Sequence, residues 1–160
     1  MPSSQLQSIL VQHRLVTPDQ MQYTLDTAAG DAEFTWLELL LLWNLVEEQH
    51  VVSHIESIAK VPRCDLDRLS RVPHDVLALV PPDVASEHRV MPIAVEPDGD
   101  LRVAMVDPTD ESAIEELEFF CDRRILREAA PATAVAWALH NYYGVQSALW
   151  PPNQYARSAA

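Results

Sequence analysis

The chain has 160 residues, of which 48% are hydrophobic, and its 24 acidic and 11 basic residues give a formal net charge of −13. This length allows one or two small domains with a hydrophobic core of their own. Nucleic acids and anionic lipids bind through basic residues that neutralise phosphates, so the charge argues against both and favours a protein partner with a basic surface.

The first sixty residues contain a helical repeat, in segments 6–25 and 36–55. Apolar residues recur in the two segments at an offset of thirty residues, for example Ile9/Leu39, Leu10/Leu40 and Val16/Val46. Each copy has the spacing of a helix, a short turn and a second helix. In the first copy Thr17 precedes a proline and is followed by Gln20, a pattern typical of a helix start. Residues 1–60 are therefore expected to form a four-helix module of two packed helical hairpins.

Residues 60–82 are broken into short pieces by four prolines, which interrupt helices and strands. Short helical turns are expected at 73–79 and 82–88. The boundary between two domains is placed near Val61, so that the second domain covers residues 61–145.

The second domain is predicted to be an α+β unit. Two apolar runs flank a turn in which Gly99 can adopt the positive φ of a tight hairpin. Pro108 ends the second strand, and Thr109 or Asp110 can cap the helix that follows. The predicted order is a hairpin at 90–106, a helix at 110–121, a third strand at 124–129 and a helix at 131–143.

The helix at 110–121 places four residues on one apolar face at spacings of three and four: Ile114, Leu117, Phe120 and Cys121. The tail, residues 146–160, has no periodicity and reads as a linker or docking tail. The predicted fold class is therefore α+β, with an N-terminal four-helix module followed by a small three-stranded sheet packed with helices.

The two cysteines, Cys64 and Cys121, lie far apart and outside any Cys-x-x-Cys pattern. Cys121 is expected to be a small buried hydrophobe. No signal peptide is recognised, and no apolar run reaches the roughly 20 residues of a membrane span. These features predict a cytoplasmic protein without direct membrane insertion.

Five stretches carry a family resemblance: LVTPDQ (15–20), VPRCDLD (61–67), HRVMPIAVEPDGDLRVAMVDPTD (88–110), IEELEFF (114–120) and HNYYG (140–144). In this order they resemble the N-terminal region of the type II secretion and type IV pilus assembly ATPases, the MshEN-like domain of the GspE/PilB type. The resemblance covers residues 5–144. It implies docking onto a component of a secretion, pilus or motility machine, such as the cytoplasmic domain of an inner-membrane assembly protein.

The ATPase core that follows this region in the family has no counterpart here. The sequence contains no G-x-x-x-x-G-K-[ST], and its three glycines, Gly30, Gly99 and Gly144, cannot build a phosphate-binding loop. We therefore expect no ATP hydrolysis, no catalytic residues and no cofactor.

Some relatives bind cyclic di-GMP through the helical repeat. The resemblance implies an Arg-Leu-Gly start, a second Gly between the helices and a late Gln in each copy, because small residues admit the ligand while Arg and Gln read phosphate and guanine. The matching positions here are Gln5, Gln7, Arg14 and Ala28, then Thr35, Leu37, Asn44 and Ile58. We expect a scaffold that has lost the nucleotide site. A cyclic di-GMP receptor that regulates secretion or motility is the alternative.

Two other groups of residues have the types needed for chemistry. His50 and His54 are spaced to share a metal ion, but no third ligand follows at a suitable distance, and we expect no metal site. Asp107, Asp110 and Glu111 could hold a hard cation or act as paired carboxylates, although helix capping explains all three. A cryptic hydrolase or metal enzyme is therefore the weaker rival hypothesis.

The run WLELLLLWNLV (36–46) provides the best candidates for partner binding. Leu42 and Trp43 stand where the family pattern is normally polar, and Leu37 replaces a glycine. Either neighbouring helices cover this run, or it forms an exposed patch that docks a partner or a second copy of the chain.

Three arginines, Arg123, Arg124 and Arg127, form the one basic cluster and either pair with adjacent glutamates or contact an acidic partner. The expected function is thus that of a non-catalytic adaptor in the cytoplasm. A partner would recruit it to the inner-membrane face.

Overall fold

The computed structural model describes residues 4–30, 34–147 and 149. Its first part, here called the repeat module, consists of α1 (Gln5–Gln12), α2 (Pro18–Ala29), α3 (Trp36–Leu42) and α4 (Glu48–His54), which continues into the π-helix η1 (Ile55–Ala59). Thr17 and Thr35 begin α2 and α3 with complete capping boxes, so each hydroxyl accepts the N–H three residues further on. The helical repeat is thus present as two helix–turn–helix hairpins.

The second part, the sheet module, carries helices around three strands. Its elements are α5 (Leu66–Leu69), α6 (His74–Leu77), α7 (Pro82–His88), β1 (Val90–Val95), β2 (Leu101–Met105), α8 (Glu111–Cys121), β3 (Ile125–Ala129) and α9 (Ala132–Tyr143). The central strand β2 pairs antiparallel with β1 and parallel with β3. Gly99 has a φ of 97° in the hairpin turn, as expected there. The predicted α+β class is confirmed.

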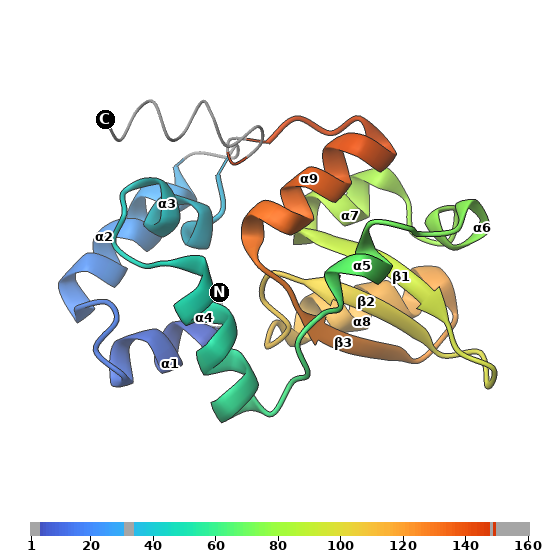
Figure 1. The fold of residues 1–160 in the computed structure, drawn as a ribbon. Coiled ribbons are helices and arrows are strands. Elements are labelled where there is room, and N and C mark those ends of the chain that lie inside the picture. Colours follow the sequence, from blue (N-terminus) through green and yellow to red (C-terminus); the bar gives the residue numbers. More distant parts are fainter. Residues whose placement is uncertain (1–3, 31–33, 148, 150–160) are drawn as a thin grey trace.

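Both faces of the sheet are covered. Neighbouring residues on a strand point to opposite faces, as Arg127 and Glu128 do on β3. The Arg127 guanidinium binds Glu111 at the start of α8, whereas the Glu128 carboxylate binds Arg102 and lies close to Cys64. Figure 1 shows α8 behind the sheet and α5 in front of it. None of the helices in the described ranges is long and apolar enough to cross a membrane.

The two modules lie side by side (Figure 1) and share one continuous hydrophobic core, to which the repeat module contributes Leu10 and Leu40 and the sheet module Val103 and Leu139. Polar contacts also join them, among them Leu6 with Thr109, Glu38 with Arg89, and Glu48 with Thr133. The division into domains at residue 61 stays a prediction.

Helix α8 differs from its sequence prediction in one respect. Its buried residues are Ala113, Ile114 and Leu117, while Phe120 is 49% exposed and Cys121 is only half-buried. The buried face of α8 is therefore narrower than the apolar face predicted from the sequence. Of the two candidate caps, Asp110 is the one used, because its carboxylate accepts the N–H groups of the second and third helical residues.

Candidate functional site

The two turns of the repeat module have the same geometry. Arg14 and Asn44 both adopt the left-handed conformation, with φ of 60° and 57°. In each turn the N–H of the following leucine donates to the carbonyl four positions before the turn residue, at 2.9 Å. The resemblance assigns glycine to both positions. The backbone shape that glycine favours is therefore kept, although an exposed side chain is now present at each turn.

Two motif positions of the second copy are occupied by residues with structural roles. The Thr35 hydroxyl accepts the Glu38 N–H at 3.2 Å and so caps α3. Leu37 is 3% exposed and belongs to the core. Ala28 and Ile58, in the places of the two glutamines, are half-buried apolar residues. At these four positions no arginine or glutamine side chain is present to read phosphate and guanine.

The predicted partner-binding patch is only partly at the surface. Trp43 is 38% exposed, and Leu42 is half-buried against the core. Leu37 is buried, so it is not part of the exposed patch. The structure adds Tyr23 of α2, which is 67% exposed and lies with its ring 5.7 Å from the Trp43 ring. Tyr23 was missed because it belongs to the other hairpin, and no sequence spacing links the two positions.

The three arginines do not form one basic surface. Arg127 binds Glu111 at 2.8 Å and also donates to the carbonyl of Pro108, which ties β3 to the start of α8. Arg123 donates to the carbonyl of Gly99 at 2.9 Å and supports the hairpin turn. Arg124 is exposed. Two members of the predicted cluster therefore have internal partners, and pairing with an adjacent glutamate holds for Arg127.

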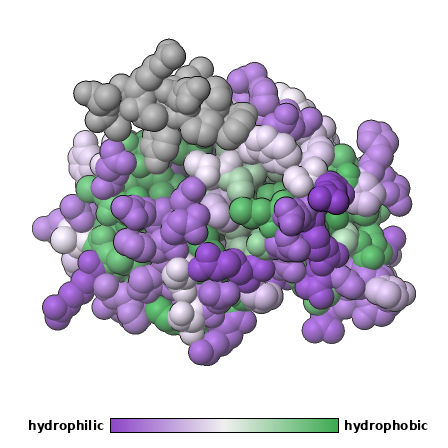
Figure 2. All heavy atoms as spheres, viewed as in Figure 1, coloured by the Kyte–Doolittle hydropathy of each residue, from purple (hydrophilic) through white to green (hydrophobic). Residues whose placement is uncertain are grey.

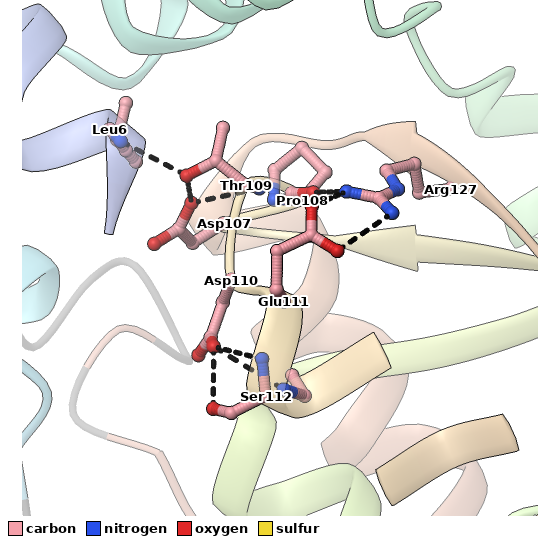
Figure 3. A network of polar contacts seen from close by, with 9 residues as sticks. Leu6, Asp107, Pro108, Thr109, Asp110, Glu111, Ser112 and Arg127 are labelled. Carbon is pink, nitrogen blue, oxygen red and sulfur yellow. Dashed lines mark hydrogen bonds and ion pairs between the residues drawn. The ribbon is translucent and has the colours of Figure 1, made fainter. Parts of the chain in front are cut away.

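The acidic residues at the start of α8 belong to a network of hydrogen bonds and an ion pair (Figure 3). Asp107 accepts hydrogen bonds from the backbone and the hydroxyl of Thr109, and Asp110 caps α8. The carboxylates thus hold the turn and the helix start. Burial raises the pKa of Asp107, whereas the hydrogen bond from Arg127 lowers the pKa of Glu111.

Among the described residues, His50 and His54 are not part of a group of three side chains with metal-site geometry, and the His54 ring lies with its centroid 5.5 Å from that of His13. Nδ1 of His54 lies 2.7 Å from the carbonyl oxygen of His50. Within the described residues, the side chains with the geometry of a metal site are instead Glu87, His88 and Glu116. Nε2 of His88 lies 2.5 Å from a Glu116 carboxylate oxygen, so a direct contact joins these two members of the group.

An open groove of about 340 Å³ lies at the junction of the two modules. Its walls come from α4, α5 and α9 and include Leu66, Leu69 and Trp137. Glu48 lies at the edge, where it accepts the N–H and hydroxyl of Thr133 in the first turn of α9. Figure 2 shows apolar side chains gathered over this middle part of the face. The groove offers an apolar surface but no group of converging catalytic residues.

Comparison with known proteins identifies relatives of this architecture. The chain is 27% identical over 139 residues to the type IV pilus assembly ATPase PilB of Thermus thermophilus, covering 86% of this chain. It is 26% identical over 147 residues to PilB of Myxococcus xanthus, covering 88% of this chain. The chain spans only 15% and 24% of the length of these two relatives.

Two solved structures have a similar fold. MshE, determined with cdg (cyclic di-GMP), is 25% identical with a TM-score of 0.59, and the match covers 88% of this chain and all of that one. The N-terminal domain of XpsE is 18% identical with a TM-score of 0.66, and the match covers 90% and 99% of the two chains. Residues 59–149, more than half of this chain, match the MshEN domain. This chain therefore belongs to the MshEN domain family, as its resemblance to the N-terminal region of secretion and pilus ATPases implied.

Proposed function

We propose that this chain is a non-catalytic docking module that binds a protein component of a secretion, pilus or motility machine. It works in the cytoplasm and reaches the inner-membrane face through its partner. The relatives place such a domain at the N-terminal end of much longer ATPases. The present sequence has no P-loop, so its contribution to such a machine lies in a binding surface.

One observation carries the proposal. Both copies of the repeat keep the backbone of the turn, but in the second copy two of the motif positions are used for capping and for the core. Thr35 caps its own helix and Leu37 is buried. A fold that is retained without its ligand-reading side chains still presents a surface, and in the second copy this surface displays Trp43.

The Tyr23–Trp43 pair gives this surface the character of an interface. Tyrosine and tryptophan provide large contact areas with a polar end, and both are enriched at interface hot spots. The two rings lie on different hairpins, so a partner that covers them would contact both copies of the repeat. The surrounding net charge of −13 favours a partner of opposite charge.

Site-specific photo-crosslinking in the native cells tests this proposal. A photoreactive amino acid in place of Trp43 is expected to yield one discrete protein adduct, and the same amino acid in place of the exposed Glu56 is expected to yield none. An adduct that contains only a second copy of the chain would assign self-association instead. Absence of any protein adduct at Trp43, in a folded variant, would contradict the proposal.

The alternative function is that of a cyclic di-GMP receptor. It is favoured by the similarity to MshE, which was determined with this nucleotide, and by the left-handed turns at Arg14 and Asn44. The motif residues argue against it, because Gln5 and Thr35 replace the two arginines that the family pattern requires. A direct nucleotide titration distinguishes the two functions.

A further inference from the structure

The end of α8 exposes two neighbouring phenylalanines. Phe119 is 82% exposed and Phe120 is 49% exposed, and their rings pack edge to face with centroids 5.6 Å apart. The buried side of the same helix is formed by Ile114 and Leu117. Because one residue turns the helix by about 100°, Phe119 projects away from the sheet, on the side opposite Leu117. Phe119 is not part of the hydrophobic core that the described residues form.

Acidic side chains surround this aromatic pair. Residues three and four positions apart are neighbours on a helix surface, so Phe119 lies between Glu115, Glu116 and Asp122. Glu116 lies against His88, whereas Glu115 and Asp122 are exposed. The patch is therefore an apolar centre with a negative rim, the arrangement of a partner-binding surface.

We propose that Phe119 and Phe120 dock a positively charged amphipathic segment of a partner protein, whose apolar residues cover the two rings while its lysines or arginines meet the acidic rim. This inference rests on the proposed function and identifies the chemistry of the partner. It assigns the contact to α8, on the sheet module, rather than to the Trp43 surface on the repeat module. The chain thus has one exposed aromatic surface on each module, and the two surfaces can bind the same partner or two different partners.

Charge decides among the possible occupants of this surface. A second copy would bring an identical acidic rim against the first, in a chain with a net charge of −13, and like charges oppose such a contact. An anionic lipid surface would be repelled for the same reason. A basic amphipathic segment satisfies both the rings and the carboxylates.

Peptide binding measured by fluorescence anisotropy on the full chain tests the inference. The probe is a helical peptide of about five turns built from leucine and lysine, and the comparison peptide has glutamate in place of every lysine. The lysine peptide is expected to bind with micromolar affinity, and the glutamate peptide is expected not to bind. The double variant Phe119→Ser, Phe120→Ser is expected to bind the lysine peptide about tenfold more weakly.

Matched controls separate the rim from general acidity. Glu115→Gln with Asp122→Asn removes two exposed charges beside the rings, and Glu47→Gln with Glu56→Gln removes two exposed charges on the repeat module. The first pair is expected to weaken binding about threefold or more and to reduce its salt dependence, because each rim charge contributes to an electrostatic contact. The second pair is expected to have little effect. Leu66→Ser controls for loss of an exposed apolar residue elsewhere.

Equal binding of the lysine peptide to the wild type and to the double phenylalanine variant would overturn the inference, as would equal losses in the two charge variants. Concentration-dependent sedimentation that the phenylalanine changes abolish would assign the surface to a second copy and also overturn it. Urea unfolding of each variant verifies that the fold is intact. These outcomes leave the Trp43 crosslinking test unaffected, so failure of this inference is distinguishable from failure of the proposed function.

Discussion

Arg89 and Glu38 form a largely buried ion pair that joins the sheet module to the repeat module. The guanidinium donates to both carboxylate oxygens of Glu38, at 3.0 and 3.1 Å, and the Glu38 side chain is 4% exposed. Glu38 also accepts the Thr35 N–H in the capping box of α3. One carboxylate thus serves a helix start and a contact between modules. This explains why a glutamate interrupts the apolar run of α3.

Loss of Arg89 should destabilise the chain strongly. Arg89→Met keeps most of the apolar stem but leaves the buried Glu38 carboxylate without its cation, which costs roughly 3 kcal/mol of unfolding free energy. Adding Glu38→Gln should recover part of this loss, because the buried charge is then removed. Urea unfolding measures both effects. Glu111→Gln, which breaks an exposed pair with Arg127, should change stability by less than about 1 kcal/mol. Similar losses in Arg89→Met and Glu111→Gln would contradict this account.

Thr109 provides a second connection between the modules. The Leu6 backbone N–H donates to its hydroxyl oxygen at 3.0 Å, and this hydroxyl in turn donates to Asp107. Thr109→Val removes the acceptor without changing the shape of the side chain and should cost about 1–3 kcal/mol. Amide hydrogen exchange gives a local measurement, because the Leu6 N–H should lose protection more than the amides inside α2. Unchanged protection of Leu6 would contradict the contact.

Asp107 should make stability depend on pH with a definite sign. Burial raises its pKa in the folded state, so the folded chain holds this proton more tightly than the unfolded chain. Its contribution is fully present below the unfolded pKa and is lost as pH rises through the raised folded pKa. Asp107→Asn should therefore gain stability relative to the wild type at neutral pH, and this gain should shrink on acidification.

Urea unfolding of the wild type and Asp107→Asn between neutral pH and about pH 4, near the unfolded pKa of aspartate, tests this dependence. Glu111 has the opposite sign, because Arg127 lowers its pKa and its contribution is lost as pH falls. Glu111→Gln is therefore the control, although its solvent exposure keeps the effect small. A relative gain of Asp107→Asn that grows at low pH would show that the charged form is favoured.

Replacing the two left-handed turn residues by glycine should change the stability of the chain by different amounts. A non-glycine residue in this conformation destabilises the folded chain by about 1–2 kcal/mol. Glycine avoids this cost, but it increases the conformational entropy of the unfolded chain, which destabilises the folded state by roughly 0.5–1 kcal/mol. Arg14→Gly should therefore stabilise the chain by about 0.5 kcal/mol, and Asn44→Gly by less, because asparagine tolerates this conformation. Thermal unfolding is the measurement. Clear destabilisation by Arg14→Gly would mean that the Arg14 side chain makes a stabilising contact.

The sequence predicted features that depend on local spacing and missed those that depend on packing. The capping pattern at Thr17 and the turn at Gly99 are encoded within a few residues, and the structure has both. Phe120 was assigned to the buried face because it lies three residues from Leu117, yet this position falls at the border of the face and remains half-exposed. Helical spacing alone does not give the width of the buried stripe.

The long-range contacts had no local signal. Leu6 and Thr109 are separated by 103 residues. A leucine in a helix and a threonine in a turn are both common, so neither residue type signals a contact between distant segments. The ring contact between Tyr23 and Trp43 likewise depends on how α2 packs against α3. The sequence pattern therefore singled out Leu42 and Trp43 of the second copy but gave no signal for Tyr23 of the first, and their role in partner binding stays a prediction.

A calorimetric titration of cyclic di-GMP into the purified wild-type chain tests the central claim most directly. The motif positions carry Gln5 and Thr35 in place of arginine, and Leu37 is buried in the core. The account therefore predicts no saturable heat of binding up to about 100 µM nucleotide, a concentration well above the Kd of a receptor with micromolar affinity. Saturable binding in the micromolar range would contradict the account and establish the chain as a nucleotide receptor.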